Sequence, residues 1–170
     1  MDLVAKELDI FYNYKNKIMK ALLTDEKLVH LIDEDYDFSK AKNLAYNQVF
    51  PCDYVIDTVE EGKTFICFDV DLQQSANKTY FFPTIYVWVF AHKSKLRLSA
   101  GGIRIDKICS RIADLLNGSA EISLGELDLY SVKRYPLMTD FIGKVMTFHA
   151  VDFNRLYNPK KTIPANRRGG

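Results

Sequence analysis

The sequence predicts an α+β fold: a single domain whose antiparallel or mixed sheet of four to five strands packs against two main helices. Three observations predict it. Apolar residues recur with helical spacing in residues 3–23 and 103–117, they alternate with a two-residue period elsewhere, and 48 % of the 170 residues are apolar, which is enough for one core. The order helix, helix, strand, strand, helix, strand, strand favours helices gathered against such a sheet.

The N-terminal region is predicted to form two helices. In residues 3–23 the apolar side chains lie three, four or seven positions apart, and Asp2 is expected to cap the first turn. Thr24 is expected to cap a second, short helix, which should stop at the acidic run 33–35 because acids are unfavourable at the negative end of a helix. Residues 39–46 are expected to add one helical turn.

Strands are predicted where the period becomes two residues. Residues 50–56 form a short extended piece, followed by a strand over 65–72 that has one apolar face and carries Asp69 and Asp71 on the other. Residues 84–91 are apolar on both faces, so this strand should lie at the centre of the sheet, covered on one side by helices and on the other by more sheet or a neighbouring subunit. Two further extended segments cover 121–134 and 141–152.

Glycines delimit the helix predicted over residues 103–117. Gly101 and Gly102 break the chain before it, and Gly118 supplies a left-handed residue after it. The two leading glycines match neither phosphate-loop spacing, so they are interpreted as a turn.

Composition argues against several classes of protein. No apolar stretch reaches the length of a membrane span and the first residues do not resemble a signal peptide, so the chain is expected to be made and kept in a cytoplasm, without a membrane partner. The cysteines are expected to be buried thiols, and the histidines lack the short spacings of metal sites. These residues are Cys52, Cys67, Cys109, His30, His92 and His149.

Asp69 and Asp71 are the best candidates for chemistry. Two carboxylates on one strand face can hold a divalent cation with a third acid such as Asp53, as in a small metal-dependent nuclease. Alternating charge on the wet face of a strand gives the same pattern without any reaction. A nuclease would also place Glu-x-Lys on the next strand, and residues 84–91 contain neither residue. We therefore expect no catalytic, cofactor-binding or metal-binding residues, and no enzyme.

The last eighteen residues, 153–170, are expected to form a basic extended arm on a domain of residues 1–152. They hold five cations and no acid, so the arm carries +5 while the domain sums to −4. Such an arm can grip nucleic acid by counterion release, lie along an acidic face of another protein or another copy, or stay solvated without a function. The second interpretation is favoured, with acidic docking patches at 33–35, 60–61, 69–71 and 126–128. The cations are Arg155, Lys160, Lys161, Arg167 and Arg168.

The layout resembles the tail terminator proteins of long-tailed bacteriophages. The resemblance covers most of residues 1–152 and depends on the order of elements more than on a motif. Its parts are the long helix 3–23, the Phe50-Pro51 entry, the hairpin 65–91, the helix 103–116 and the closing segment 141–148. The arm departs from the shorter members of that family.

The resemblance implies a structural virion protein. It implies a ring, typically of six copies, that caps the tail tube and joins it to the head connector in the neck of the virion, after assembly in the host cytoplasm. DNA would pass through the lumen without specific binding, and Asp69 and Asp71 are expected to line it. Tyr86 and Trp88 are expected to contact partners, because aromatic residues anchor interfaces. The alternatives are another neck component, an adaptor or stopper ring, and the nuclease.

Overall fold

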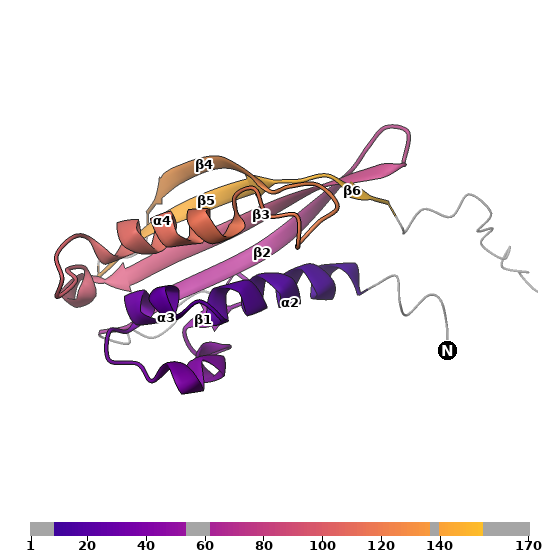
Figure 1. Cartoon of the computed structure of the whole chain (residues 1–170). Helices are drawn as coiled ribbons and strands as arrows, with labels where there is room; N and C mark the ends of the chain where they lie inside the picture. The colour runs from indigo at the N-terminus through magenta and orange to yellow at the C-terminus, as the bar shows by residue number, and fades with distance from the viewer. Residues whose placement is uncertain (1–8, 54–61, 137–139, 155–170) are drawn as a thin grey trace, which may run out of the picture.

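The computed structural model describes residues 9–53, 62–136 and 140–154. It has one mixed sheet with its helices on one face, so the predicted α+β fold is confirmed (Figure 1). In chain order the elements are α2 (Ile10–Leu23), α3 (Glu26–Ile32), η1 (Phe38–Leu44), β1 (Val49–Phe50), β2 (Thr64–Gln74), β3 (Tyr80–His92), η2 (Lys93–Lys95), α4 (Arg104–Leu116), β4 (Asp128–Tyr135), β5 (Phe141–His149) and β6 (Asp152–Phe153).

Within the described residues the sheet has six strands in the order β1-β2-β3-β5-β4, with β6 paired to β3. The long strands β2, β3, β5 and β4 are antiparallel to their neighbours, whereas β1 is parallel to β2. The prediction gave four to five strands. The number is higher because β1 and β6 have only two residues each, too few to show a period in the sequence. The strand predicted to be central is central: β3 lies between β2 and β5. Strand β6 spans the expected boundary between domain and arm.

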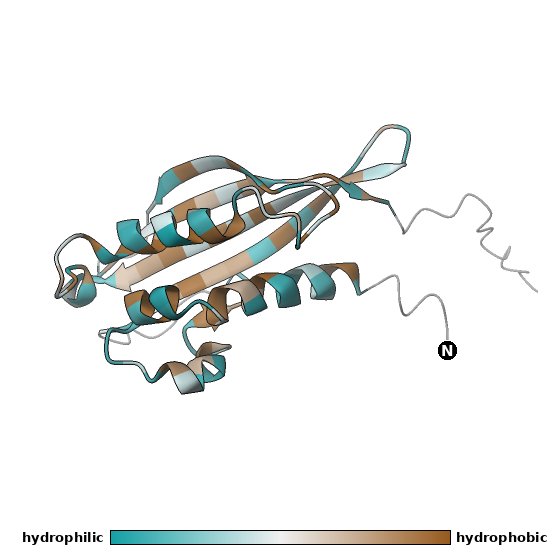
Figure 2. Ribbon diagram, viewed as in Figure 1, coloured by the Kyte–Doolittle hydropathy of each residue, from teal (hydrophilic) through white to brown (hydrophobic). Residues whose placement is uncertain are grey.

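The core lies between the sheet and helices α2, α3 and α4. Period-two alternation turns every second strand residue toward the helices, where the apolar ones form the core. Figure 2 shows many hydrophobic residues along β2 and β3, and helices in which hydrophobic and hydrophilic residues are interspersed. The fully buried side chains of this face include Ile66 and Phe68 on β2, Ile85, Val87 and Val89 on β3, Met146 and Phe148 on β5, and Ile108, Ile112 and Leu116 on α4.

The two N-terminal helices differ from prediction at their caps. The described part of the first begins at Asp9, so the expected Asp2 cap lies outside the described residues. The prediction of Thr24 as cap of the second helix is wrong. Asp25 caps α3, accepting a hydrogen bond of 2.7 Å from the Leu28 amide, because Thr24 still belongs to the end of α2, where its amide and hydroxyl both donate to the Lys20 carbonyl. As predicted, α3 stops at the acidic run, and a 3₁₀ turn, η1, follows.

The strand expected from residue 121 begins only at Asp128. Leu127 is held by the loop after α4 instead: the Gly118 amide donates to its carbonyl (2.7 Å), and its own amide donates to the Ser119 carbonyl (3.0 Å). Gly118 has φ +77°, so the predicted left-handed residue at the end of α4 is confirmed.

Two cysteines behave as predicted and one does not. Cys67 and Cys109 are buried free thiols, and burial raises the pKa of Cys109 to about 11. Cys52 is exposed, because the chain leaves the sheet at Pro51, directly after the short strand β1.

Candidate assembly surface

The face of the sheet away from the helices carries the predicted partner-binding aromatics. Tyr86 and Trp88 alternate along β3 with the buried residues of the core, so they point to the opposite face, where both are half-buried. Their rings stack with centroids 5.8 Å apart, and Tyr135 of β4 meets Trp88 edge-on at 6.5 Å. We call the sheet face that carries Tyr86, Trp88 and Tyr135 the open face. Large aromatic side chains on such a face are suited to anchor a partner.

One end of the open face is closed by a second apolar cluster. It consists of Phe50, Phe65, Cys67, Phe90 and Phe141, all buried, with Trp88 packed against it. This cluster explains why the residues of β3 are apolar on both faces of the strand. Helices cover one face, and aromatic side chains cover part of the other. It also holds Trp88 in a fixed position, which lowers the entropy lost when a partner binds.

The two candidate acids of β2 differ in their surroundings. Asp69 lies opposite Tyr86 and forms an ion pair of 2.7 Å with Lys15 of α2, while the same carboxylate oxygen accepts a bond of 2.8 Å from the Val70 amide. Asp71 lies opposite Thr84 and is exposed. Within the described residues, no three His, Cys, Asp or Glu side chains gather as a metal site would require, so Asp53 is not brought to this pair.

The basic arm is described only at its root. The cations Arg155, Lys160, Lys161, Arg167 and Arg168 lie outside the described residues. At the root, β6 pairs with the start of β3, and Asn154 bonds to the carbonyls of Lys78 and Thr79 at the tip of the β2–β3 hairpin. Tyr14 of α2 also donates a short hydrogen bond to Asp152. The arm therefore leaves the domain from a fixed point at one end of the sheet.

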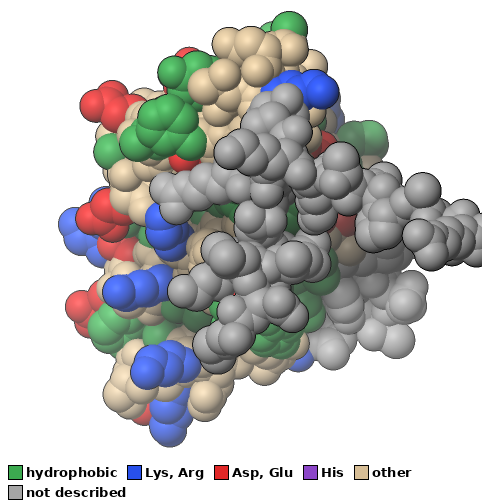
Figure 3. Space-filling view, turned by 90° about the vertical axis from the view of Figure 1, so that its right-hand side faces the viewer, with side chains coloured by type: hydrophobic (Ala, Val, Ile, Leu, Met, Phe, Trp, Pro, Cys, Tyr) green, Lys and Arg blue, Asp and Glu red, His purple; other side chains and the backbone are tan. Residues whose placement is uncertain are grey.

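That end exposes aromatic side chains beside charged ones. Tyr80 and Phe153 stack at 5.5 Å, and Phe82 is 43 % exposed nearby on the same strand as Tyr80. Figure 3 looks onto this end of the molecule and shows hydrophobic side chains at the surface next to lysine and arginine side chains. Asp and Glu side chains lie among them in the same view, and the exposed aromatic residues are the feature that is typical of a protein-contacting surface.

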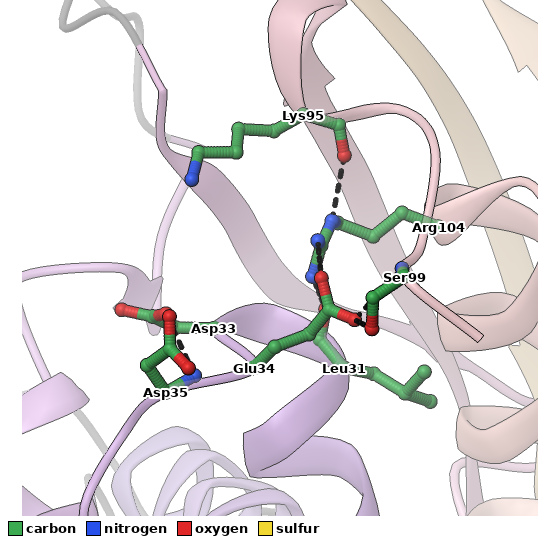
Figure 4. Close-up of polar contacts among 7 residues, drawn as sticks. All are labelled: Leu31, Asp33, Glu34, Asp35, Lys95, Ser99 and Arg104. Atoms are coloured by element: carbon green, nitrogen blue, oxygen red, sulfur yellow. Dashed lines mark hydrogen bonds and ion pairs between the residues drawn. The ribbon is translucent and has the colours of Figure 1, made fainter. Parts of the chain in front are cut away.

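A buried arginine that the sequence analysis did not identify ties α4 to the C-terminal end of α3 and to η2. Arg104 is only 3 % exposed, and its guanidinium donates to the carbonyls of Lys95 (2.6 Å) and Leu31 (2.5 Å) and to the carboxylate of Glu34 (2.7 Å) (Figure 4). Ser99 donates to Glu34 through its amide and its hydroxyl. The signal was present in the sequence, because Arg104 lies four residues before Ile108 on the apolar stripe of its helix.

Glu34 is consequently a structural acid. The bonds from Ser99, and then that from Arg104, lower the pKa of Glu34 to about 2. The acidic run 33–35 therefore offers less free charge for docking than the sequence predicts. The patch at 60–61 lies outside the described residues.

A second clamp joins the same two helices. Arg111 of α4 binds both carboxylate oxygens of Asp25, at 3.0 and 2.5 Å, and this pairing lowers the pKa of Asp25. Lys144 of β5 pairs with Asp106 of α4 at 2.6 Å. Helix α4 is thus fixed to α3 and to the sheet, so the open face is backed by a rigid layer.

Replacing Glu34 with glutamine should weaken the fold at neutral pH but not in strong acid. A carboxyl whose folded pKa is lowered stabilises the fold above its ordinary pKa of 4.5 and loses that contribution as the pH falls toward about 2. The melting temperatures of wild type and Glu34→Gln should therefore differ at pH 6.5 and converge near pH 2. Asp35→Asn is the matched control, because Asp35 is exposed in the same run. A gap of equal size at both pH values would contradict the assignment.

The fold and surface define a small α+β protein with one sheet face backed by helices and the other carrying aromatic side chains. A comparison with family models then identifies the particular family. Residues 15–150 match the model of YomW, so the chain belongs to the YomW family, and it is a phage-associated protein. No curated protein matches the chain. Among the described residues, no helix is long and apolar enough to span a membrane.

Proposed function

We propose that this protein is a structural virion protein acting as a phage tail terminator. Several copies, six by likeness to the terminators that the sequence resembles, form a ring that caps the tail tube and joins it to the head connector. The observation that carries the proposal is the open face of the sheet, where Tyr86, Trp88 and Tyr135 form a row of aromatic contacts on a rigid domain of a phage-associated chain. The protein is assembled in the host cytoplasm and resides in the neck of the virion.

The proposal assigns a task to each charged region. DNA passes through the lumen without specific binding, and an acidic lining keeps the duplex from adhering. Asp71 is better suited to this lining than Asp69, because Asp71 is exposed whereas the charge of Asp69 is balanced by Lys15. The basic arm straps the ring to an acidic surface of a neighbouring copy, the tail tube protein or a connector protein. The protein performs no reaction and needs no cofactor or metal.

A phage that lacks this protein provides the test. A terminator stops growth of the tail tube, so its loss should give tails of irregular, excessive length that are not joined to heads in electron micrographs. Loss of an adaptor or stopper ring, the alternative neck components, should leave tails of normal length separated from heads. A purified protein that stays monomeric and cleaves DNA with a divalent cation, with loss of cleavage in Asp69→Asn, would overturn the proposal in favour of a nuclease.

Deleting residues 156–170 should impair assembly far more than folding. The arm contains few apolar residues and its root is already bound at Asn154, so the melting temperature of the monomer should change little. The ring, or its attachment to tail tubes, should weaken in sedimentation assays, and the difference from wild type should shrink at higher salt, which screens the charges of the arm. The control keeps the arm length and replaces Lys160, Lys161, Arg167 and Arg168 with glutamine. A large fall in melting temperature after the deletion would contradict an assembly role.

A further inference from the structure

Both long edges of the sheet are partly open. Strand β4 forms one edge. At the other, β1 pairs only with Ile66 and Cys67, so no strand in the described part of the chain covers β2 from 68 to 74. The start of β4 is covered, because the Leu129 amide donates to the Asn117 side chain (2.8 Å), but residues 131–135 have no described strand beside them. An unpaired edge is a template for a strand from another molecule.

The backbone groups that point outward can be identified on both edges. On β2, the Ile66 amide donates to the Gln48 carbonyl outside the β2–β3 ladder, so alternation turns Val70 and Leu72 to the same side. On β4, the Leu129 amide points away from β5. Because the register shifts by one residue after Leu129, the backbone groups of Val132 and Arg134 also point outward. A hydrogen-bonded antiparallel ladder between the two edges therefore pairs Val132 and Arg134 with even-numbered residues of β2. One such register places Val132 opposite Leu72 and Arg134 opposite Val70.

Direction agrees with this ladder. Three successive antiparallel pairings, β2 with β3, β3 with β5 and β5 with β4, make β4 run opposite to β2. A second copy that continues the sheet in the same sense thus brings its β4 antiparallel to the open edge of β2. Residues 68–74 are not blocked by β1.

Side-chain faces and charges agree as well. Lys133 lies opposite Val145, which lies opposite Trp88, so Lys133 is on the open face with Asp71. In the register that places Val132 opposite Leu72, Lys133 falls opposite Asp71. On the other face, Val132, which is exposed, falls opposite the half-buried Leu72. A shift of one residue would put Lys133 opposite Val70 or Leu72, whose side chains lie on the helix face. A shift of two would put it opposite the uncharged Gln73 or opposite Asp69, which is already paired with Lys15, so face and charge select the register.

We infer that copies of this chain join head to tail, with β4 of one copy added to residues 69–74 of β2 of the next and Lys133 paired with Asp71. The inference rests on the proposed ring and specifies its interface, and it reassigns Asp71 from the lumen lining to the contact between copies. Because the two edges differ, the contact is heterologous, which is the kind of interface that closes into rings. In the free chain, the Lys15–Asp69 pair lies at the middle of the β2 edge and guards it against unspecific strand addition.

Disulfide trapping tests the register directly. In a Cys52→Ser background, which removes the exposed thiol, Asp71→Cys and Lys133→Cys are combined in one chain. In the inferred ladder they form a non-hydrogen-bonded pair with Cα atoms about 4.5 Å apart, inside the range of a disulfide. Within one copy they lie three strand spacings apart and on different rungs of the sheet, so their separation exceeds roughly 14 Å, which is too far. Mild oxidation should therefore give a ladder of covalent oligomers on a non-reducing gel.

Controls separate the possible outcomes. Asp71→Cys with Val132→Cys places the thiols on opposite faces and should give no ladder, and neither should Lys133→Cys alone. Light scattering of the Cys52→Ser parent measures assembly without any trap. If the parent forms rings but the matched pair does not cross-link, or if Lys133→Cys alone cross-links β4 to β4, the inferred interface is wrong while the ring survives. If the parent forms no assembly at all, alone or with tail tubes, the proposed function itself fails.

Discussion

Replacing Phe68 with alanine should lower the free energy of unfolding by about 3–5 kcal/mol. Phe68 is fully buried on β2, and Ile66 and Val70 on the same face are buried with it beneath the helices. Truncation removes an aromatic ring from a site between the sheet and the helices, where packed neighbours limit how far the core can collapse, so the cost contains a cavity contribution as well as the lost transfer energy. For a chain of this size the melting temperature should fall by roughly 6–20 °C.

The matched control is Phe82→Ala. Phe82 lies on the adjacent strand β3 but is 43 % exposed, so the same truncation should cost about 1 kcal/mol or less. Should Phe68→Ala prove too unstable to purify, Phe68→Leu keeps most of the volume and should show a smaller loss of about 1.5 kcal/mol. Equal effects of the Phe68 and Phe82 truncations would contradict the assignment of the core to the helix side of the sheet.

Local periodicity was sufficient to predict the fold of this chain. The apolar stripe of α4 and the glycines around it located the helix to within a residue or two, and the doubly apolar segment of β3 predicted its central place. Both features arise because burial imposes a period of 3.6 or 2 on neighbouring residues, which a single sequence displays.

What periodicity missed was contact between distant residues. Leu31 and Glu34 lie about seventy positions before Arg104, so nothing local links them. From the sequence alone, an arginine within an apolar stripe is expected to reach solvent. Only the structure shows the carbonyl groups that accept its hydrogen bonds and allow it to be buried. The late start of β4 has the same origin, because the Leu127 backbone bonds to Gly118 and Ser119 instead of to β5.

The candidate surface was predicted in part for the same reasons. Alternation along β3 placed Tyr86 and Trp88 on one face, and the structure shows them stacked there. The pairing of Asp69 with Lys15 depends on how α2 crosses the edge of β2, and the position of Lys133 depends on the order of the strands. Neither follows from spacing along the chain, so the two open edges were found only in three dimensions.

Removing the guanidinium of Arg104 should destabilise the fold by about 3 kcal/mol. Arg104→Met fills a similar volume but leaves the carbonyls of Leu31 and Lys95 without the donors that Arg104 provides. A buried acceptor without a partner destabilises the fold by more than a hydrogen bond normally stabilises it, because the acceptor has lost its hydrogen bonds to water and gained none in return. Denaturant unfolding of wild type and variant at neutral pH measures the loss.

Two further variants show whether geometry or charge is responsible. Arg104→Lys keeps the positive charge but cannot donate in three fixed directions, so it should recover only a minor part of the lost stability. Arg97→Met removes an exposed arginine a few residues earlier and should change the free energy of unfolding by less than about 0.5 kcal/mol. Full recovery in Arg104→Lys would mean that the positive charge beside Glu34 stabilises this junction. Since the same arginine ties α4 to the end of α3 at Leu31 and Glu34 and to η2 at Lys95, its loss should also loosen the layer behind the open face. Assembly should then fail at temperatures at which the isolated domain is still folded.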